Sequence, residues 1–208
     1  MKKGVFITFE GPEGCGKSTH AKLLKDHLES LGHKVILTRE PGGTAVGRTI
    51  REILAYPSEP LTALTEVMLF AADRALHVEG VILPAVNAGK VVLSDRFIDS
   101  TIAYQIGGRE LPEDLVRYLN SISSKGLLPD LTILLDIPVE EGLKRARAEN
   151  REFDRFEKET IAFHRRVRDK YLEIAKESPK RIKIINSQGK IQDIQEKIRE
   201  AIKLEGII

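Results

Sequence analysis

The sequence predicts an α/β fold in three layers, with about five parallel strands and helices on both faces of the sheet. Short runs of β-branched and aliphatic residues alternate along the chain with longer stretches of helical periodicity. Each run is nearly all apolar, which is typical of strands covered on both faces. The length of 208 residues, 41% of them apolar, suffices for one large domain with its own core. We therefore expect a single domain over residues 1–208.

Each element follows from its local sequence. The strands are expected at residues 5–9, 35–38, 91–94, 131–136 and 182–185. A helix is expected over residues 17–32, because its leucines recur at helical spacing and it closes on a glycine. A mostly apolar helix should follow over about 61–86, where Pro84 kinks or ends it. The densely charged segment 139–151 then precedes an amphipathic helix expected over 156–175.

Composition narrows the classes of partner. Thirty-three Lys and Arg residues against 31 Asp and Glu residues leave a net charge of +2, so no global field favours nucleic acid or a membrane surface. The chain has one cysteine, Cys15, so it cannot form an intrachain disulfide, and we expect a cytoplasmic location. No uninterrupted run of 18 apolar residues occurs, and no membrane span is expected.

A phosphate-binding loop is the strongest motif. Residues 11–18 read Gly-Pro-Glu-Gly-Cys-Gly-Lys-Ser, the Walker A pattern, between a predicted strand and a predicted helix. Backbone N–H groups and the helix dipole can hold polyphosphate there, and glycines let the backbone approach it. Lys17 should bridge the β- and γ-phosphates, and Ser18 should bind Mg²⁺. The residues expected around the nucleotide are Gly11, Glu13, Gly14, Cys15, Gly16, Lys17, Ser18 and Thr19.

Two nucleotide-binding classes are disfavoured. A GTP switch needs Asn-Lys-x-Asp and Asp-x-x-Gly, and neither occurs. Motors and large ATPases usually exceed this length and carry an acidic pair after a strand as a hydrolytic base. Here the strands that end in an acid carry a single one, Asp95 or Asp136.

Polar residues at two further strand ends indicate a second substrate. Asp95 and Arg96 follow the third strand, and Arg39 follows the second. Open α/β sheets place ligand chemistry at the carboxyl ends of their strands, so these side chains should converge. Asp95 is suited to the Mg²⁺ shell through water, and two converging arginines suit a phosphate dianion.

Five segments together resemble the thymidylate kinase family over essentially the whole chain. They are FEGPEGCGKST at 9–19, TREPGGT at 38–44, FAADR at 70–74, DRFIDSTIAYQ at 95–105 and PDLTILLD at 129–136. The resemblance implies a P-loop nucleoside-monophosphate-kinase fold with a short lid at about 142–155. It also implies transfer of the γ-phosphoryl group of ATP to dTMP.

The resemblance also implies roles for individual residues. Arg39 and Arg96 would hold the dTMP phosphate, Phe70 would stack on thymine, and Arg74 would bind its exocyclic oxygen. Phe70 and Arg74 are four positions apart, so a helix places them on one face. The full set expected around dTMP is Glu13 near the 3′-hydroxyl, Arg39, Phe70, Arg74, Arg96, Ser100, Thr101, Tyr104 beneath the sugar, and Gln105.

The charged segment is the candidate lid. A metaphosphate-like transition state needs cations that arrive when both substrates are bound. Some members of the family carry this arginine in the P-loop and others in the lid, and Gly14 after the P-loop acid resembles the lid type. We expect Arg147 and Arg151 to close on the phosphates, with Arg145 a weaker candidate. All three should lie between two predicted helices. The expected catalytic set is Lys17, Asp95, Arg96, Arg147 and Arg151, with no general base because a phosphate oxygen is already ionised.

Two other functions remain open on sequence grounds. The chain could phosphorylate another pyrimidine nucleoside monophosphate, or it could be a nucleotide-dependent switch without phosphoryl transfer. The helix expected over 61–86 is apolar around more of its circumference than one sheet face requires, which favours a homodimer, as does the family's habit.

Overall fold

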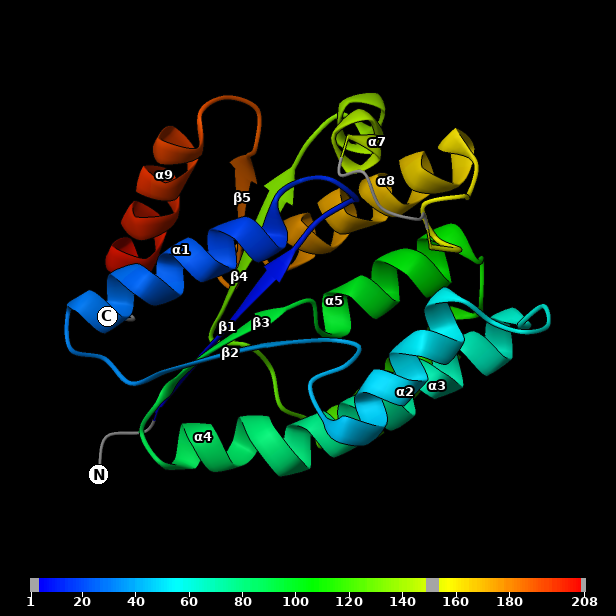
Figure 1. Ribbon diagram of the computed structural model, residues 1–208, viewed down its shortest axis with the longest axis horizontal. Coiled ribbons are helices and arrows are strands. Elements are labelled where there is room, and N and C mark those ends of the chain that lie inside the picture. The colour runs from blue at the N-terminus through cyan, green and yellow to red at the C-terminus, as the bar shows by residue number, and fades with distance from the viewer. Residues whose placement is uncertain (1–3, 149–153, 207–208) are drawn as a thin grey trace.

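The computed structural model describes residues 4–148 and 154–206, and a five-stranded sheet forms its centre (Figure 1). The strands are β1 (Val5–Glu10), β2 (Val35–Arg39), β3 (Val91–Asp95), β4 (Leu131–Asp136) and β5 (Ile182–Asn186). They lie in the order β2-β3-β1-β4-β5, and every pairing is parallel. The predicted α/β fold is confirmed.

Alternate residues of the central strands pack on opposite faces of the sheet. Ile7 and Phe9 of β1 join a core with α1 (Lys17–Ser30) and α9 (Ile191–Leu204). Phe6 points to the other face, where it packs against the helical stretch before β3. The strand period of two therefore divides the core into two layers, and the sheet separates them.

The remaining described helices are α2 (Ala45–Ala55), α3 (Ala63–His77), α4 (Leu83–Asn87), α5 (Ile98–Thr101), α6 (Glu113–Ser124), α7 (Val139–Arg147) and α8 (Ile161–Glu177), with π-helical turns η1 (Val78–Ile82) and η2 (Ile102–Gly108). In Figure 1, α2, α3 and α4 run below the sheet, while α7 and α8 lie above it and to its right. The π turn η1 precedes Pro84, so the long helix passes through the proline with an altered turn. None of the helices in these described ranges is long and apolar enough to cross a bilayer.

The strands end one residue later than expected at four places, and each added residue is polar. β1, β2, β3 and β5 extend to Glu10, Arg39, Asp95 and Asn186. The expectation that all strands are covered on both faces is wrong for β2 and β5, which lie at the sheet edges and alternate between buried and accessible residues. The carboxyl edge of the sheet is therefore a row of polar side chains.

The helix boundaries near the lid differ from the expectation. Arg145 and Arg147 lie inside α7 and not between helices. α8 begins at Ile161 instead of residue 156, because the Asp154 side chain accepts hydrogen bonds from the backbone of Phe156 and Glu157 and holds a turn. Thr160 then caps α8 by accepting from Phe163 N.

Candidate active site

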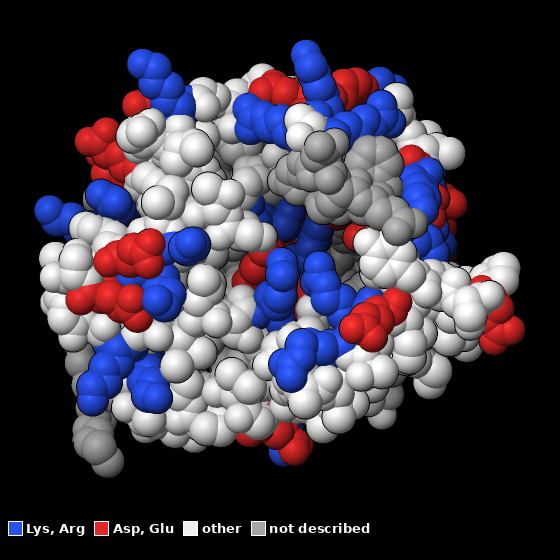
Figure 2. All heavy atoms as spheres, viewed as in Figure 1, with Lys and Arg blue, Asp and Glu red and all other residues white. Residues whose placement is uncertain are grey.

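A cavity of about 500 Å³ lies at the carboxyl edge of the sheet. Figure 2 shows Lys and Arg side chains gathered around a hollow near the middle of the visible face. Lys17, Arg39, Arg51 and Arg96 line one side of the cavity, which we call the P-loop end. Phe70, Arg74, Thr101 and Gln105 line another side, which we call the Phe70 end. Most of the residues predicted for the site therefore meet in one cavity.

Two P-loop glycines are required by packing within the protein. A Cβ on Gly11 would collide with the backbone carbonyl of Leu135, and a Cβ on Gly14 would collide with that of Gly142 in α7. Both have positive φ, 139° and 68°. Gly16, at φ 90°, precedes the first residue of α1. The glycine pattern thus serves contact with β4 and α7 as well as any approach to phosphate.

Lys17 rests on its own loop. Its Nζ donates to the carbonyl oxygens of Gly11 and Pro12, at 3.0 and 2.9 Å, and lies 3.4 Å from Cys15 Sγ. Cys15 is buried, and burial raises the pKa of its thiol. Its side chain therefore fills space beneath the loop as a neutral thiol.

Hard oxygen donors stand beside Lys17. Ser18 Oγ donates to Asp95 Oδ2, and Arg39 Nη2 lies 3.7 Å from the same carboxylate oxygen. Thr19, next on α1, is exposed and lines the cavity. The described residues hold no group of three or more His, Cys, Asp or Glu side chains that could bind a metal.

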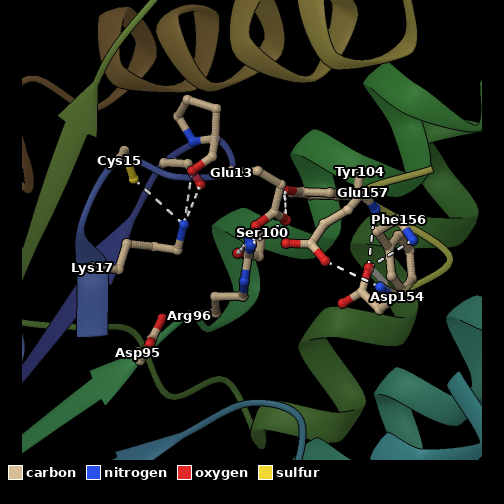
Figure 3. A network of polar contacts seen from close by, with 12 residues as sticks. Glu13, Cys15, Lys17, Asp95, Arg96, Ser100, Tyr104, Asp154, Phe156 and Glu157 are labelled. Atoms are coloured by element: carbon tan, nitrogen blue, oxygen red, sulfur yellow. Dashed lines mark hydrogen bonds and ion pairs between the residues drawn. The ribbon is translucent and has the colours of Figure 1, made fainter. Parts of the chain in front are cut away.

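Arg96 is held in an uncommon conformation (Figure 3). Its φ is 74°, a left-handed value that is strained for a residue with a Cβ. Two backbone contacts fix it, from Arg96 N to Phe9 O at 2.9 Å and from Ser94 Oγ to Arg96 O at 2.8 Å. Its guanidinium donates to Glu13 Oε1 at 2.7 Å and lies 5.0 Å from the centre of the Tyr104 ring. This geometry aims the guanidinium into the cavity.

Two carboxylates three positions apart have opposite pKa shifts. Burial and then the neighbouring Asp99 raise the pKa of Glu10 to about 7. Burial would also raise the pKa of Glu13, but Arg96 and Lys17 outweigh it and lower that pKa to about 2. Glu10 accepts from Phe97 N at 2.7 Å and Ser100 Oγ at 2.5 Å, so it orders the turn that carries Arg96.

Four positively charged side chains gather at the P-loop end, namely Lys17, Arg39, Arg51 and Arg96. The side chain of Arg39 is 48% exposed. Arg51 donates to Pro41 O at 3.1 Å, and its pKa is lowered by burial and then by Arg39 and Arg96. Arg39 and Arg96 oppose protonation of Arg51, and Asp95 and Asp154 favour it. Sequence reasoning missed Arg51, because it lies in the middle of α2 and outside any motif.

At the Phe70 end, the positive charge of Arg74 is paired with a carboxylate of the protein itself. Arg74 is only 2% exposed. It donates from Nε to Glu40 Oε2 at 2.8 Å, from Nη1 to Asn120 Oδ1 at 2.6 Å, and from Nη2 to Thr101 Oγ1 at 2.8 Å. Three of its five N–H groups are thereby used, and the position of the side chain is fixed. Phe70, one turn away on α3, is half-buried in the cavity wall.

Tyr104 and Ser100 connect the two ends. Tyr104 OH donates to Glu13 Oε1 at 2.7 Å, and burial raises the pKa of the phenol. Ser100 Oγ lies 2.7 Å from Tyr171 OH, and both hydroxyls bond to Glu10. The P-loop and the segment after β3 thus bring Glu13, Arg96 and Tyr104 into one hydrogen-bonded group.

The lid region gives a mixed outcome. Asp154, which falls within the lid expected at about 142–155, lines the cavity together with Phe156 and Glu157. Arg147 is exposed at the end of α7 and is not among the residues that line the cavity. Arg145 donates to Ser187 O at 3.0 Å and to Glu141. The predicted Arg151 lies outside the described residues.

Comparison with known proteins gives a consistent result. The family model described as thymidylate kinase matches residues 9–198. A thymidylate kinase of Geotalea uraniireducens is 49% identical over 205 residues, 96% of each chain, and one of Nostoc sp. is 47% identical over 203 residues, 97% of this chain and 96% of that one. The crystal structure of thymidylate kinase from Ehrlichia chaffeensis superposes with a TM-score of 0.80 at 32% identity, covering 97% of this chain and 99% of that one.

Proposed function

The chain belongs to the thymidylate kinase family, and we propose how its residues divide the transfer of the γ-phosphoryl group from ATP to dTMP. The P-loop end would hold the phosphates of both substrates, and the Phe70 end would hold thymine. One observation supports this division above all. A single cavity is lined by crowded cations on one side and by an aromatic ring beside a compensated arginine on another.

The cations at the P-loop end would take the phosphates. Lys17 would leave the carbonyl oxygens of its loop for the β- and γ-phosphates of ATP. Arg39, Arg51 and Arg96 would bind the phosphate of dTMP, which relieves the repulsion among them. Glu13, held ionised by Arg96, would face the sugar.

The Phe70 end would recognise the base. Phe70 would stack on thymine and supply affinity, while the two N–H groups that Arg74 has left would reach its O4. Thr101 and Gln105 would lie along the base edge, and Tyr104 would lie beneath the sugar. Rigid polar groups can discriminate between bases, because a wrong base leaves a buried donor or acceptor unpaired and binding then loses free energy.

Mg²⁺ fits the site as a phosphate-bound ion. Ser18 Oγ and the Asp95 carboxylate are hard oxygen donors next to Lys17, and Mg²⁺ in kinases usually takes only one or two protein ligands. Ser18 would bind it directly and Asp95 through water. When bound, the ion would neutralise charge on the ATP phosphates.

The residues need not move a proton in the transfer step. The attacking oxygen of dTMP is ionised at neutral pH, so the side chains position the two phosphates in line and exclude water. Arg96 holds the acceptor, and Arg147 and Arg151 would bring positive charge to the transferred group when the lid closes. Because Arg147 is exposed at the end of α7, this role requires α7 or the residues after it to move.

We also propose that the protein is a homodimer. Exposed apolar side chains line one face of α3 at four- and eight-residue spacing, Leu64, Met68 and Leu76, and α2 adds Val46 and Ile53. A second copy of the chain would cover this face. Sedimentation at micromolar concentration should give twice the mass of the chain, and a single-chain mass would exclude the dimer. A cytoplasmic location, which the single cysteine favours, also stays a proposal.

A panel of acceptors tests the proposed function. With ATP and Mg²⁺, dTMP should be converted to dTDP with a higher kcat/KM than dUMP, dCMP or UMP. Preference for another monophosphate would shift the assignment to a different pyrimidine. Saturable dTMP binding with no dTDP formed would overturn phosphoryl transfer.

A further inference from the structure

Gln105 is the polar group whose orientation at the Phe70 end matters most. It is 1% exposed, lies on η2 and lines the cavity. A glutamine amide carries a donor and an acceptor of nearly equal shape, so the same side chain can read opposite base edges according to how it is turned. Whatever fixes the amide therefore determines which base edge it accepts.

Glu66 of α3 fixes that orientation. Gln105 Nε2 donates to Glu66 Oε1 at 2.7 Å, and Glu66 is completely buried. An ionised carboxylate only accepts hydrogen bonds, so the amide nitrogen must face Glu66 and the amide oxygen must face away from it. Within the described part of the chain, Gln105 Oε1 has no hydrogen-bond partner.

Two arginines keep Glu66 in its role as an acceptor. Arg109 Nε donates to both carboxylate oxygens, at 3.2 and 3.1 Å, and Arg155 Nη2 donates to Oε2 at 2.5 Å. A guanidinium has no acceptor atom, so neither arginine could receive a hydrogen bond from a protonated Glu66. The charge of Arg109 is shared with Glu159, which lies 2.5 Å from its Nη1.

We infer that Glu66 is a positioning residue that sets base specificity by presenting the Gln105 carbonyl to the N3 edge of the pyrimidine. This inference rests on the proposed placement of thymine between Phe70 and Arg74. Thymine offers a donor at N3 and an acceptor at O4, which match the Gln105 oxygen and the Arg74 N–H groups. Cytosine has an acceptor at N3, which would face the Gln105 oxygen, another acceptor. Its donor at N4 would face the Arg74 N–H groups, which are also donors.

The first measurement compares dTMP with its 3-deaza analogue, which lacks the N3–H donor and carries a hydroxyl group in place of the O4 carbonyl. The wild-type protein should use the analogue at least about 10-fold less efficiently in kcat/KM, because the Gln105 oxygen loses its N3–H partner and Arg74 meets a hydroxyl group instead of a carbonyl. A difference below about 2-fold would overturn the inference. This test needs no variant, so it holds even if substitution of Glu66 prevents folding.

The second measurement uses Glu66→Gln. An amide at residue 66 can accept from the arginines while donating to Gln105, which frees the Gln105 amide to turn. The part of the 3-deaza penalty that comes from N3 should disappear, so the penalty should shrink several-fold, and the preference for dTMP over dCMP should fall about 10-fold. An equal loss for all three acceptors would mean that Glu66 is only structural.

Glu159→Gln is the matched control. It removes one carboxylate charge from Arg109, which Glu66 also contacts, but Glu159 does not bond to Gln105. It should leave both ratios at their wild-type values, and a change as large as that of Glu66→Gln would overturn the inference. In a Gln105→Leu background, Glu66→Gln should change neither ratio further.

Failure of the base placement would look different. If Phe70→Ala leaves KM for dTMP unchanged, thymine does not lie at the Phe70 end and the proposed placement fails. If Phe70→Ala raises KM but Glu66→Gln leaves the acceptor ratios unchanged, only the role of Glu66 fails.

Discussion

The P-loop end and the Phe70 end of the cavity use arginine in opposite ways. At the P-loop end, Arg39 is half exposed, and the pKa of Arg51 is lowered by burial and then by Arg39 and Arg96. At the Phe70 end, Arg74 is buried and saturated on one side by a carboxylate, an amide and a hydroxyl. The proposed function assigns the first set of cations to phosphate, whereas Arg74 is already paired with a carboxylate of the protein. Charge attracts phosphate, while a fixed donor identifies a base.

The largest expected effect is at Arg96. Arg96→Ala should lower kcat/KM for dTMP about 10³-fold, because it removes the proposed charge-assisted contact to phosphate and leaves Glu13 without its cation. ATP binding, followed by calorimetry, should change little. Loss of ATP binding to the same extent would show that the two substrates do not occupy separate parts of the P-loop end.

The lid arginines should affect rate more than binding. Arg151→Ala, and to a lesser extent Arg147→Ala, should lower kcat about 10²-fold at saturating dTMP, since an electrostatic contact made in the transition state is lost. The dissociation constant of dTMP should stay nearly constant. Unchanged kcat in both variants would reject the lid as the source of transition-state charge.

A matched pair of substitutions compares the two ends directly. Arg74→Met should destabilise the fold by about 3–5 kcal/mol, because Glu40 keeps a buried charge without its arginine. Arg39→Met should change the free energy of unfolding by less than about 0.5 kcal/mol, because Arg39 is largely solvated. Thermal unfolding checks both, and similar shifts in Tm would remove the distinction between the two ends.

The smallest expected effect concerns Glu10. Its pKa is raised to about 7 in the fold, against 4.5 as the ordinary value, so the folded state binds more protons than the unfolded state between these pH values. Its contribution to stability is full below pH 4.5 and is lost as pH rises through about 7. Glu10→Gln should therefore flatten the decline of Tm over this window. If Glu10→Gln leaves the slope of Tm against pH unchanged, this prediction is contradicted.

The sequence predicted residues at both ends of the cavity, but on different grounds: motif spacing indicated the P-loop end, and the family resemblance indicated the Phe70 end. Lys17, Ser18, Asp95 and Arg96 lie in contiguous motifs at strand ends, where parallel topology alone brings them together. The helix boundaries near the lid were wrong because an Asp154 turn replaces the first turn of the expected helix.

Other features could not be predicted because they depend on long-range contacts. Gly14 packs against Gly142, and Gln105 is oriented by Glu66, at separations that no local pattern encodes. Arg51 sits in α2, a helix that carries no motif, and it becomes part of the site only through packing. Tertiary structure, not residue type, assigns these side chains their partners.

The division between the two ends can be tested by the salt dependence of binding. Calorimetry would follow dTMP and thymidine, which lacks the phosphate, between about 50 and 500 mM KCl. If the cations of the P-loop end attract phosphate and the Phe70 end reads the base, dTMP affinity should fall steeply with salt while thymidine affinity stays nearly constant. Equal salt slopes for the two ligands would contradict the division.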